Sequence, residues 1–510
     1  MSEKRAPAWS NFQLLALAAC LLGASAVFHL FCAATGKSFY RDIHLGAALE
    51  YARTRIDLFH PIIIGFNATQ TPTPQELPLW QAAAAVAFKL FGTWIGWANL
   101  TSLFFFSTGL FPLYQLAKIY YGSRCACWTL VFFLAQPLIF LNAGLGSTDG
   151  FSLTSSIWFL FFAVKLLQKP TLLWWLLTCA SGIVAALSKL PFFMAAGLAV
   201  VFLTVAFHRT SLRAWLLMGG VAVTVGAVFL AWTVYTGRCL ALAEFPLVDL
   251  RMSNPDMRFW YFGDLHYRLS PMNWLKGGWR ILNACFGSIA LAGLFIASLA
   301  FLRQNVFGKL WLIGAFLTTL IFTHLILHHW HYFLMFTPAV ALVTAQAALA
   351  WEKHLAFESR WKSLLGMGVV VLILSLSIVQ GMAGMKVYLI NDPYRLGMVK
   401  LIQQHSTESD KLLIQGGGWG GDELFLAHRL GLSIWDTKLL EKPESLQRLK
   451  TLGYNKLVMI AQSPLMATAH AGVPGDKGLI RESYRQYMTP AVENWPVIYQ
   501  DENILIKEIP

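Results

Sequence analysis

Residues 12–34 read FQLLALAACLLGASAVFHLFCAA, an apolar run without a single charged side chain. About 20 consecutive apolar residues are enough for a helix to cross the hydrocarbon core of a bilayer, so this stretch predicts a membrane-spanning helix. Lys4 and Arg5 precede it, and Leu17–Cys20 resembles a lipoprotein cleavage box. Because the apolar run continues to Ala34, we interpret it as a retained first span.

The remainder of the chain repeats this pattern. Of its 510 residues 56% are hydrophobic and only 13% are charged, about half the charged fraction of a soluble globular protein. The apolar stretch 79–91 is too short to span and contains Lys89, so we expect a helix that lies along the membrane interface. About eleven spans are predicted, near residues 12–34, 96–117, 126–146, 149–165, 171–188, 191–207, 214–235, 283–302, 310–327, 332–351 and 363–382.

Loop charge orients these spans. If the N-terminus is cytoplasmic, every short inner loop carries at least two basic residues, whereas the short outer connections near 147 and 328 carry no Lys or Arg. The basic pairs and triplets are Lys4 and Arg5, Lys118 and Arg124, Lys165 and Lys169, Arg209 and Arg213, Arg303 and Lys309, and Lys353, Arg360 and Lys362. Topology therefore explains the net charge of +13, and we expect no nucleic-acid partner.

Three segments then face the outer side: the loops 35–95 and 236–282 and everything after about residue 384. The tail alternates β-like runs at 411–415, 456–460 and 504–509 with helical stretches at 393–405 and 443–452, which predicts a small α/β domain. We therefore divide the chain into a transmembrane domain, residues 1–384, and an extracytoplasmic domain, residues 385–510. The seven cysteines all lie in the first of these, so no disulfide framework is predicted.

One glycine-rich stretch in the tail has two interpretations. Gly416–Gly421 follows a predicted strand and fits G-x-G-x-x-G, with Asp436 downstream. It is either a dinucleotide-binding turn or a turn that faces an acceptor. The predicted extracytoplasmic location, away from nicotinamide pools, favours the second.

Three acids are expected at one depth, near the outer membrane surface. Asp42 follows the first span, Glu76 precedes the interfacial helix, and Asp149 lies in the short outer turn before the fourth span. An acid so close to the bilayer is costly unless it is used or solvated. The structural alternatives are helix capping for Asp42 and Asp149, and a solvated loop position for Glu76.

Two further groups of side chains are candidates for a functional site. The histidines are His324, His328, His329 and His331; they form either a metal site, since zinc needs three or four convergent ligands, or a polar wall beside a substrate. The outer loop from Arg258 to Arg280, which contains His266 and Arg268, is rich in aromatic and basic residues. It is either an aromatic belt at the membrane interface or a substrate-closing loop. Lys189 either takes part in a site or only extends to the membrane surface.

Five motifs occur in a recognisable order: Glu76-Leu-Pro-Leu-Trp80, Lys89-Leu-Phe-Gly92, Asp149, Leu187-Ser-Lys-Leu-Pro191 and Tyr332-Phe-Leu-Met-Phe-Thr-Pro338. Over residues 1 to about 350 the chain resembles the GT-C superfamily, specifically bacterial relatives of protein mannosyltransferases and of the aminoarabinose transferases that modify lipid A. The resemblance implies an α-helical polytopic membrane protein of GT-C type with a small C-terminal α/β soluble domain. The chain departs from the family at Arg41-Asp-Ile-His44, where relatives usually carry a second acid.

The resemblance also implies a reaction. A sugar on a polyprenyl-phosphate donor passes, with inversion and without metal or cofactor, to a lipid, glycan or protein acceptor at the outer face of the inner (plasma) membrane. A phosphate leaving group needs no general acid, but the acceptor needs a base and the developing charge needs cations. Asp42 is the expected base, and Asp149 or Glu76 orients the acceptor. The expected substrate-binding residues are Arg268, Lys189, Tyr332, His331, His44 and His266.

The alternative function is a transporter or flippase for a lipid-linked sugar. Transporters tend to contain inverted repeats and spans broken at mid-membrane. The sequence has no convincing repeat, and its acids are expected at one surface instead of at mid-depth. These two features favour the enzyme.

Overall fold

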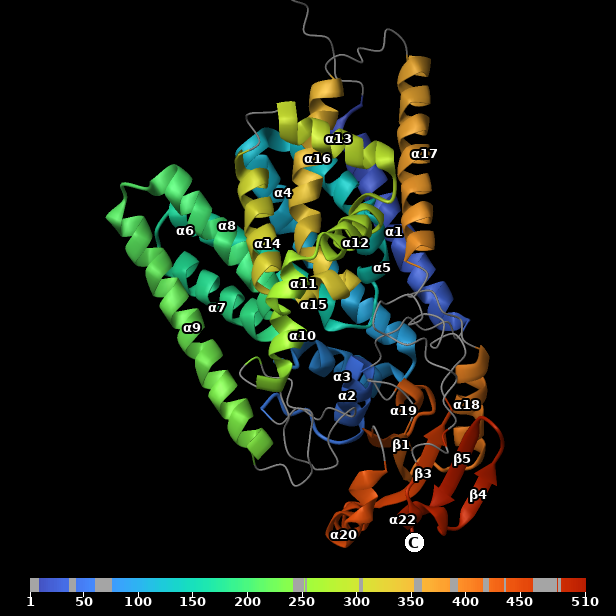
Figure 1. Cartoon of the computed structure of the whole chain (residues 1–510). Coiled ribbons are helices and arrows are strands. Elements are labelled where there is room, and N and C mark those ends of the chain that lie inside the picture. The colour runs from blue at the N-terminus through green and yellow to red at the C-terminus, as the bar shows by residue number, and fades with distance from the viewer. Residues whose placement is uncertain are drawn as a thin grey trace, which may run out of the picture. The chain divides into compact units, whose positions relative to one another are not determined.

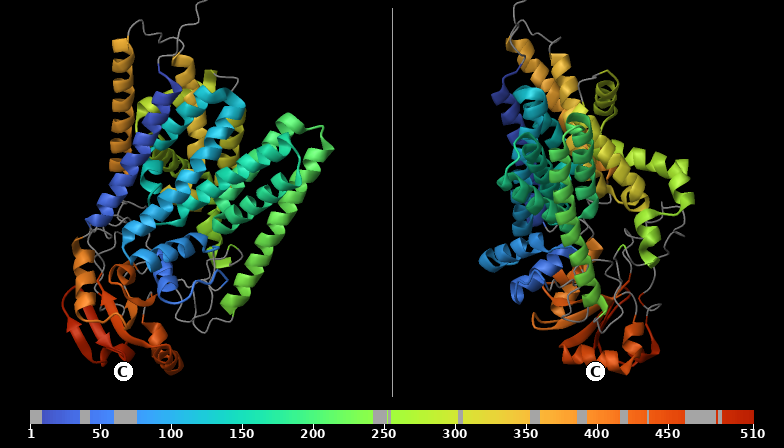
Figure 2. Two further views of the ribbon diagram at one scale, coloured as in Figure 1. Left: turned by 180° about the vertical axis from the view of Figure 1, so that it is seen from behind. Right: turned by 90° about the vertical axis from the view of Figure 1, so that its left-hand side faces the viewer.

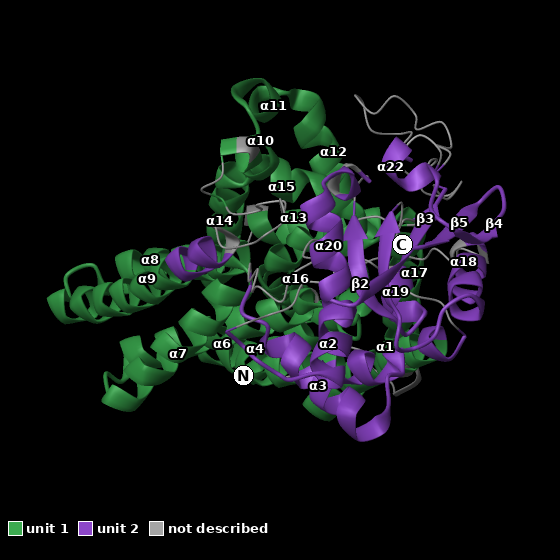
Figure 3. Cartoon of the chain, turned by 90° about the horizontal axis from the view of Figure 1, so that it is seen from below, with its two compact units in different colours: residues 1–31, 102–232, 251–386 green, residues 32–101, 233–250, 387–510 purple. Residues whose placement is uncertain are grey.

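The computed structural model describes residues 9–35, 43–59, 76–241, 252, 255–301, 306–352, 360–385, 393–415, 422–434, 437–461, 484 and 488–510. Figure 1 shows the elements in chain order. The chain divides into two compact units: unit 1 comprises residues 1–31, 102–232 and 251–386, and unit 2 comprises residues 32–101, 233–250 and 387–510 (Figure 3). The domain boundary expected at residue 384 stays a prediction.

Unit 1 contains all or most residues of the helices that come from the predicted spans. Those before residue 242 are α1 (Asn11–Ala34), α4 (Ile95–Leu134), α5 (Pro137–Asn142), α6 (Thr148–Gln168), α7 (Leu172–Ser188), α8 (Leu190–His208) and α9 (Leu212–Ala241). Those after it are η1 (Pro255–Met257), α10 (Arg258–Phe262), α11 (Leu265–Leu269), α12 (Pro271–Ile281), η2 (Leu282–Phe286), α13 (Ile289–Phe301), α14 (Val306–Ile321), α15 (Thr323–His328), η3 (Trp330–Phe336), α16 (Thr337–Glu352) and α17 (Arg360–Gly384).

The described part of the chain contains seven helices long and apolar enough to cross a membrane, or eight if one bent pair counts as a span. The predicted spans at 171–188 and 310–327 correspond to the shorter apolar helices α7 and α14. The interfacial helix expected at 79–91 is α3 (Leu79–Phe91), a separate short apolar helix. The protein is therefore a mostly helical, multi-pass membrane protein.

Two predicted spans have different boundaries in the structure. The stretches expected at 96–117 and 126–146 are covered by one long helix, α4, and the short α5. A kink divides α4 at Gly122, where φ is 84° and ψ is 167°. Glycine adopts positive φ without the steric cost that a Cβ imposes. The predicted loop between the two spans is therefore replaced by this kink.

The span expected at 283–302 is broken. Residues Pro271–Phe286 and Ile289–Leu299 meet at a bend of 99°. Gly287 lies in the bend with φ 66°, and a Cβ there would lie 1.9 Å from the carbonyl oxygen of Ser377. Only glycine fits this close approach of two backbones.

Burial separates the inner helices of unit 1 from those with exposed apolar faces. Most of α6 is buried, and it packs against α7 and α8, while α8 packs against α14. In contrast, α9 and α17 expose Val223, Leu230, Leu365, Leu372 and Val379. Because lipid tails are as apolar as these side chains, such faces suit contact with a bilayer.

Unit 2 combines α2 (Ile43–Arg53) and α3 with a five-stranded sheet of order β2-β1-β3-β5-β4. The strands are β1 (Lys411–Gln415), β2 (Leu430–Ile434), β3 (Tyr454–Ile460), β4 (Val497–Gln500) and β5 (Ile504–Glu508). The helical elements are α18 (Pro393–Gln404), α19 (Asp422–Leu426), η5 (Lys438–Glu441), α20 (Pro443–Thr451) and α22 (Pro490–Glu493). β1 pairs in parallel with β2 and β3, and β5 pairs antiparallel with β3 and β4. Figure 2 shows these strands, in orange to red, from two further sides.

Both faces of this sheet are buried, because successive side chains of a strand point to opposite faces. Leu413, Leu457 and Leu505 belong to one core, with α20 and α22. Leu412 and Val458 belong to the other, with α18 and α19. The predicted α/β domain is confirmed, and its three expected strands correspond to β1, β3 and β5; β2 and β4 were not predicted.

Candidate functional site

Asp149 lies in the first turn of α6. Ser147 is the N-cap of this helix, and its hydroxyl accepts a hydrogen bond from the Asp149 N–H at 3.4 Å. The cap suggested for Asp149 is therefore provided by Ser147. The Asp149 carboxylate is fully buried, with an exposed fraction of 0%, so its charge requires a partner close by.

Lys189 is that partner. It lies between α7 and α8 with extended backbone angles, φ −163° and ψ 100°. Its ammonium group donates a hydrogen bond to Asp149 Oδ1 and forms an ion pair with it, and its side chain is only 8% exposed. The side chain thus turns into unit 1 instead of extending to a surface. The two residues are 40 positions apart in the sequence.

Tyr332 and His331 extend this pair. Both are buried in η3, at the break before α16. The Lys189 ammonium lies 5.2 Å from the centroid of the Tyr332 ring, within the range of a cation–π contact. The His331 ring is 4.3 Å from the Tyr332 ring, and Phe192 stacks on Tyr332 at 6.0 Å. Four of the predicted site residues, Asp149, Lys189, His331 and Tyr332, therefore come together; we call them the Asp149 cluster.

Arg268 is engaged by the backbone. Its Nε donates to the Phe262 carbonyl at 2.8 Å and its Nη2 donates to the Ile321 carbonyl at 3.2 Å. The guanidinium group therefore ties the end of α10 to the end of α14. His266, two residues earlier on α11, is exposed. A phosphate that contacts Arg268 would have to share a guanidinium group that already donates hydrogen bonds to two carbonyls.

The other histidines pack among aromatic rings. His324 Nδ1 is 2.9 Å from the Trp260 carbonyl oxygen, and the His324 ring stacks on His328 with centroids 5.2 Å apart. Arg280 donates hydrogen bonds to the carbonyls of Leu327 and His328. Within the described ranges, no group of three or more His, Cys, Asp or Glu side chains is arranged to hold a metal ion.

The remaining predicted residues belong to unit 2. His44, on α2, is hydrogen-bonded to Gln81 Nε2 at 3.0 Å, and its ring lies 6.3 Å from that of Trp80 on α3. Glu76 is half-buried immediately before α3. Asp42 lies outside the described residues, as do Gly416–Gly421 and Asp436, so their roles stay predictions.

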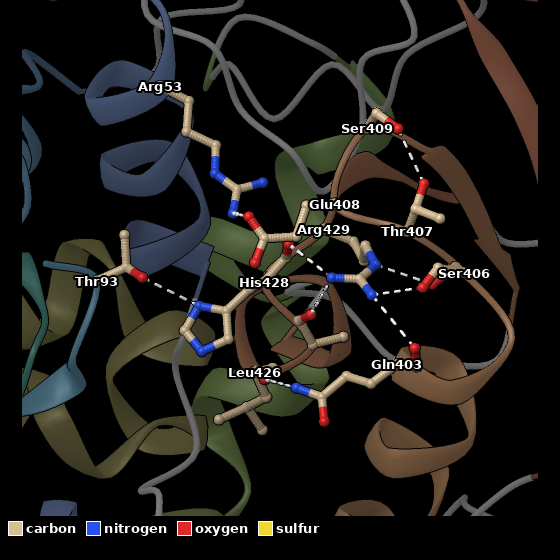
Figure 4. A network of polar contacts seen from close by, with 11 residues as sticks. Arg53, Thr93, Gln403, Ser406, Thr407, Glu408, Ser409, Leu426, His428 and Arg429 are labelled. Atoms are coloured by element: carbon tan, nitrogen blue, oxygen red, sulfur yellow. Dashed lines mark hydrogen bonds and ion pairs between the residues drawn. The ribbon is translucent and has the colours of Figure 1, made fainter.

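Sequence reasoning did not find the partners that hold α2 and α3 in unit 2. Arg53 forms an ion pair with Glu408, and Thr93 is hydrogen-bonded to His428 (Figure 4). These partners lie more than 300 residues apart. No local pattern of residues could have paired them.

The fold of the chain resembles that of two solved proteins. ArnT from Cupriavidus metallidurans, in its crystal structure bound to undecaprenyl phosphate, matches with a TM-score of 0.61 at 15% sequence identity, over 96% of this chain and 98% of that one. The same protein in the apo state matches with a TM-score of 0.60 at 15% identity. The apo oligosaccharyltransferase from Archaeoglobus fulgidus matches with a TM-score of 0.50 at 11% identity, over 87% of this chain and 69% of that one.

By sequence alone, no protein-family model and no curated protein matches the chain. The structural likeness nevertheless extends over nearly the whole length of both this chain and ArnT. It includes the transmembrane helices as well as the small C-terminal sheet domain. The fold class predicted from the sequence, an α-helical multi-pass membrane protein of GT-C type with a small C-terminal α/β domain, is therefore confirmed at the level of the fold.

Proposed function

We propose that this protein is a membrane glycosyltransferase that moves a sugar from a polyprenyl-phosphate donor to an acceptor at the outer face of the inner membrane. The observation that carries the proposal is the Asp149 cluster: a buried cation, held by a buried carboxylate and faced by a tyrosine and a histidine. A buried lysine of this kind suits a phosphate group. The fold supports the choice of donor, since the similar ArnT structure contains undecaprenyl phosphate.

The chemistry requires few groups. The acceptor oxygen forms a bond to the anomeric carbon while the bond from that carbon to the phosphate oxygen breaks, so the configuration inverts. The electron pair leaves with the phosphate, whose growing charge Lys189 stabilises, and the acceptor proton passes to a carboxylate. No metal or cofactor enters this scheme.

Asp149 and Asp42 have different roles in the proposal. Asp149 already accepts a hydrogen bond from Lys189, so its role in the proposal is to hold that cation in place. Asp42 is the proposed base, and Glu76 or Asp149 orients the acceptor. Tyr332, His331, Arg268, His44 and His266 complete the proposed substrate contacts.

The test of this assignment compares two single substitutions in purified protein with equal folded fractions. Asp42→Asn should lower turnover by at least ~10²-fold, as is typical when a general base is lost, with little change in donor affinity. Donor and acceptor come from whole cell-envelope fractions of a deletion strain, which contain lipid, glycan and protein. Mass spectrometry identifies the lipid-linked glycans that accumulate in this strain. If Asp42→Asn keeps near-normal turnover, Asp42 is not the base; an inactive Asp149→Asn variant does not by itself identify Asp149 as the base, because that variant also loses the partner of Lys189.

A second function, transport of a lipid-linked sugar, is favoured by one observation. The bent pair Pro271–Phe286 and Ile289–Leu299 is a broken span of the kind that transporters use. Proteoliposomes separate the two functions. A new glycosidic bond supports the transferase, whereas movement of the intact lipid-linked sugar between leaflets without bond formation supports the transporter.

A further inference from the structure

The C-terminal ends of α2 and α3 are attached to the C-terminal part of unit 2. Arg53, the last residue of α2, forms an ion pair with Glu408 at 3.5 Å. Thr93, two residues after α3, is hydrogen-bonded to His428 Nδ1 at 3.1 Å. Figure 4 shows both contacts side by side. We call these four residues, Arg53, Glu408, Thr93 and His428, the clasp.

Apolar packing accompanies the clasp. Phe88, near the end of α3, stacks on Phe425 of α19 with ring centroids 5.9 Å apart. Helix α2 packs against both α3 and α19. Most of α2 is buried, including Leu45, Leu49 and Tyr51. The two helices therefore contact the C-terminal domain along their sides as well as at their C-terminal ends.

An acidic side chain lies at the same contact. Burial raises the pKa of Glu50, which lies one turn before Arg53, while the nearby charges of Lys411 and Arg53 lower it. Lys411 is the first residue of β1. The α2 face thus places a carboxyl group near a lysine of the sheet, and the effect of burial on its pKa is larger than that of the nearby charges.

The turn that carries His428 is held rigidly. His428 has φ 54°, a left-handed conformation that is uncommon for residues other than glycine. The buried side chain of Arg429 fixes this turn: its Nε donates to Ser406 Oγ at 2.8 Å, and its Nη2 donates to the Ser406 carbonyl at 2.6 Å. Its Nη1 also donates to the Ala427 carbonyl at 3.0 Å. Such backbone strain persists only where the surroundings enforce it, and it is often functional.

In the sequence, α2 and α3 each follow a predicted catalytic acid. Asp42 directly precedes the first residue of α2, and Glu76 stands three positions before the first residue of α3. Each helix is therefore held at its C-terminal end and carries a predicted catalytic acid just before its N-terminal end. Helices of 11 and 13 residues are about 16 to 20 Å long, so they transmit a displacement of one end to the other.

We propose that Arg53, Glu408, Thr93 and His428 are positioning residues, through which the C-terminal domain sets the position of α2 and α3, the helices that follow Asp42 and Glu76 in the sequence. This inference rests on the proposed transferase function for its effect on turnover. The clasp itself is a matter of structure and can be tested without any substrate.

The ion pair between Arg53 and Glu408 contributes little to folding stability, so charge-reversal variants can be tested. The Glu408 side chain is 76% exposed and that of Arg53 is 22% exposed, and exposed ion pairs contribute little to folding stability. Charge reversal at either residue should therefore leave the protein folded while it replaces attraction with repulsion. A loss of turnover in a stably folded variant then indicates a change in the position of α2 and α3.

The experiment uses the full chain in lipid nanodiscs. Glu408→Arg, Arg53→Glu and the double swap are compared with Glu444→Arg, an exposed acid of α20 that serves as the matched control. Amide hydrogen exchange should become faster in 43–53 and 79–91 for each single reversal and return to the wild-type rate in the double swap. Thr93→Val, which removes the hydroxyl but keeps the volume, should have the same effect on 79–91.

Turnover is then measured with whole cell-envelope fractions of a deletion strain, which contain lipid, glycan and protein, as the source of donor and acceptor. The single reversals should lower kcat roughly tenfold, within the ~10²-fold that a displacement of about 1 Å can cost, leave KM for the lipid donor unchanged, and regain kcat in the double swap. Unchanged hydrogen exchange in both single reversals would overturn the clasp, whatever the activity. Exchange that responds without any effect on kcat would overturn the positioning role. A wild-type protein without transfer activity would instead refute the proposed function and leave the exchange result standing.

Discussion

The buried ion pair between Asp149 and Lys189 allows a test that separates stability from function. Substituting one partner leaves the other as an unpaired charge in a place where the carboxylate is 0% and the lysine 8% exposed. Loss of one member of a buried pair typically costs ~3–5 kcal/mol, whereas removal of both charges is often nearly neutral. The cation–π contact of Lys189 with Tyr332 adds ~0.5–2 kcal/mol to the loss in a lysine variant.

The variants are Asp149→Asn, Lys189→Met and the double variant. We expect each single substitution to lower the free energy of unfolding by roughly 3 kcal/mol or more, and the double variant to return to within about 1–2 kcal/mol of the wild type. The assay is unfolding of purified protein in detergent, followed by tryptophan fluorescence. The coupling free energy of the double-mutant cycle that follows from these values is ~4 kcal/mol or more.

Transfer activity gives the second half of the test. If Lys189 holds the donor phosphate, the double variant should be stable but inactive. If the pair serves only the packing of α6 against α8, the double variant should regain activity together with stability. Single variants as stable as the wild type would refute the buried pair, and an active double variant would refute the role of Lys189 in donor binding.

Three further results are expected. Burial lowers the pKa of His428 from its ordinary value of 6.5, so on acidification the unfolded chain binds this proton before the folded chain does. The folding stability should therefore be full above about pH 6.5 and fall as the pH drops towards the lowered pKa. His428→Gln should flatten this pH dependence in thermal unfolding. Asp410→Ala removes a carboxylate that forms an ion pair with Lys456 at 3.0 Å and accepts hydrogen bonds from the Thr407 N–H and from Asn455 Nδ2. It should lower the unfolding free energy by about 1.5–3 kcal/mol in denaturant titrations, because hydrogen bonds to charged groups contribute that much. In a variant without the native cysteines, a cysteine at Glu444 should react with an impermeant reagent added outside intact cells and one at Ser123 should not; labelling of Ser123 from outside would contradict the proposed topology.

Much of the fold could be predicted from local sequence. The helices α1, α6, α8 and α17 match their predicted spans closely, because membrane insertion depends on the apolar content of about 20 consecutive residues. The strands β1, β3 and β5 were predicted from their short β-like runs. In β2, by contrast, the run LGLSI between residues 430 and 434 contains a glycine and a serine, so it cannot be distinguished from a turn without its parallel neighbour β1.

The sequence by itself determined that this protein is a multi-pass membrane protein with a small α/β domain, and its motif order indicated the GT-C fold. Only the tertiary structure decided that Lys189 is paired with Asp149, that Arg268 is held by two carbonyls, and that α2 and α3 are attached to the C-terminal domain through Glu408 and His428. The reason is physical. Hydropathy and strand alternation act within one segment, whereas an ion pair depends on where packing brings distant segments together, and that packing is a property of the whole chain.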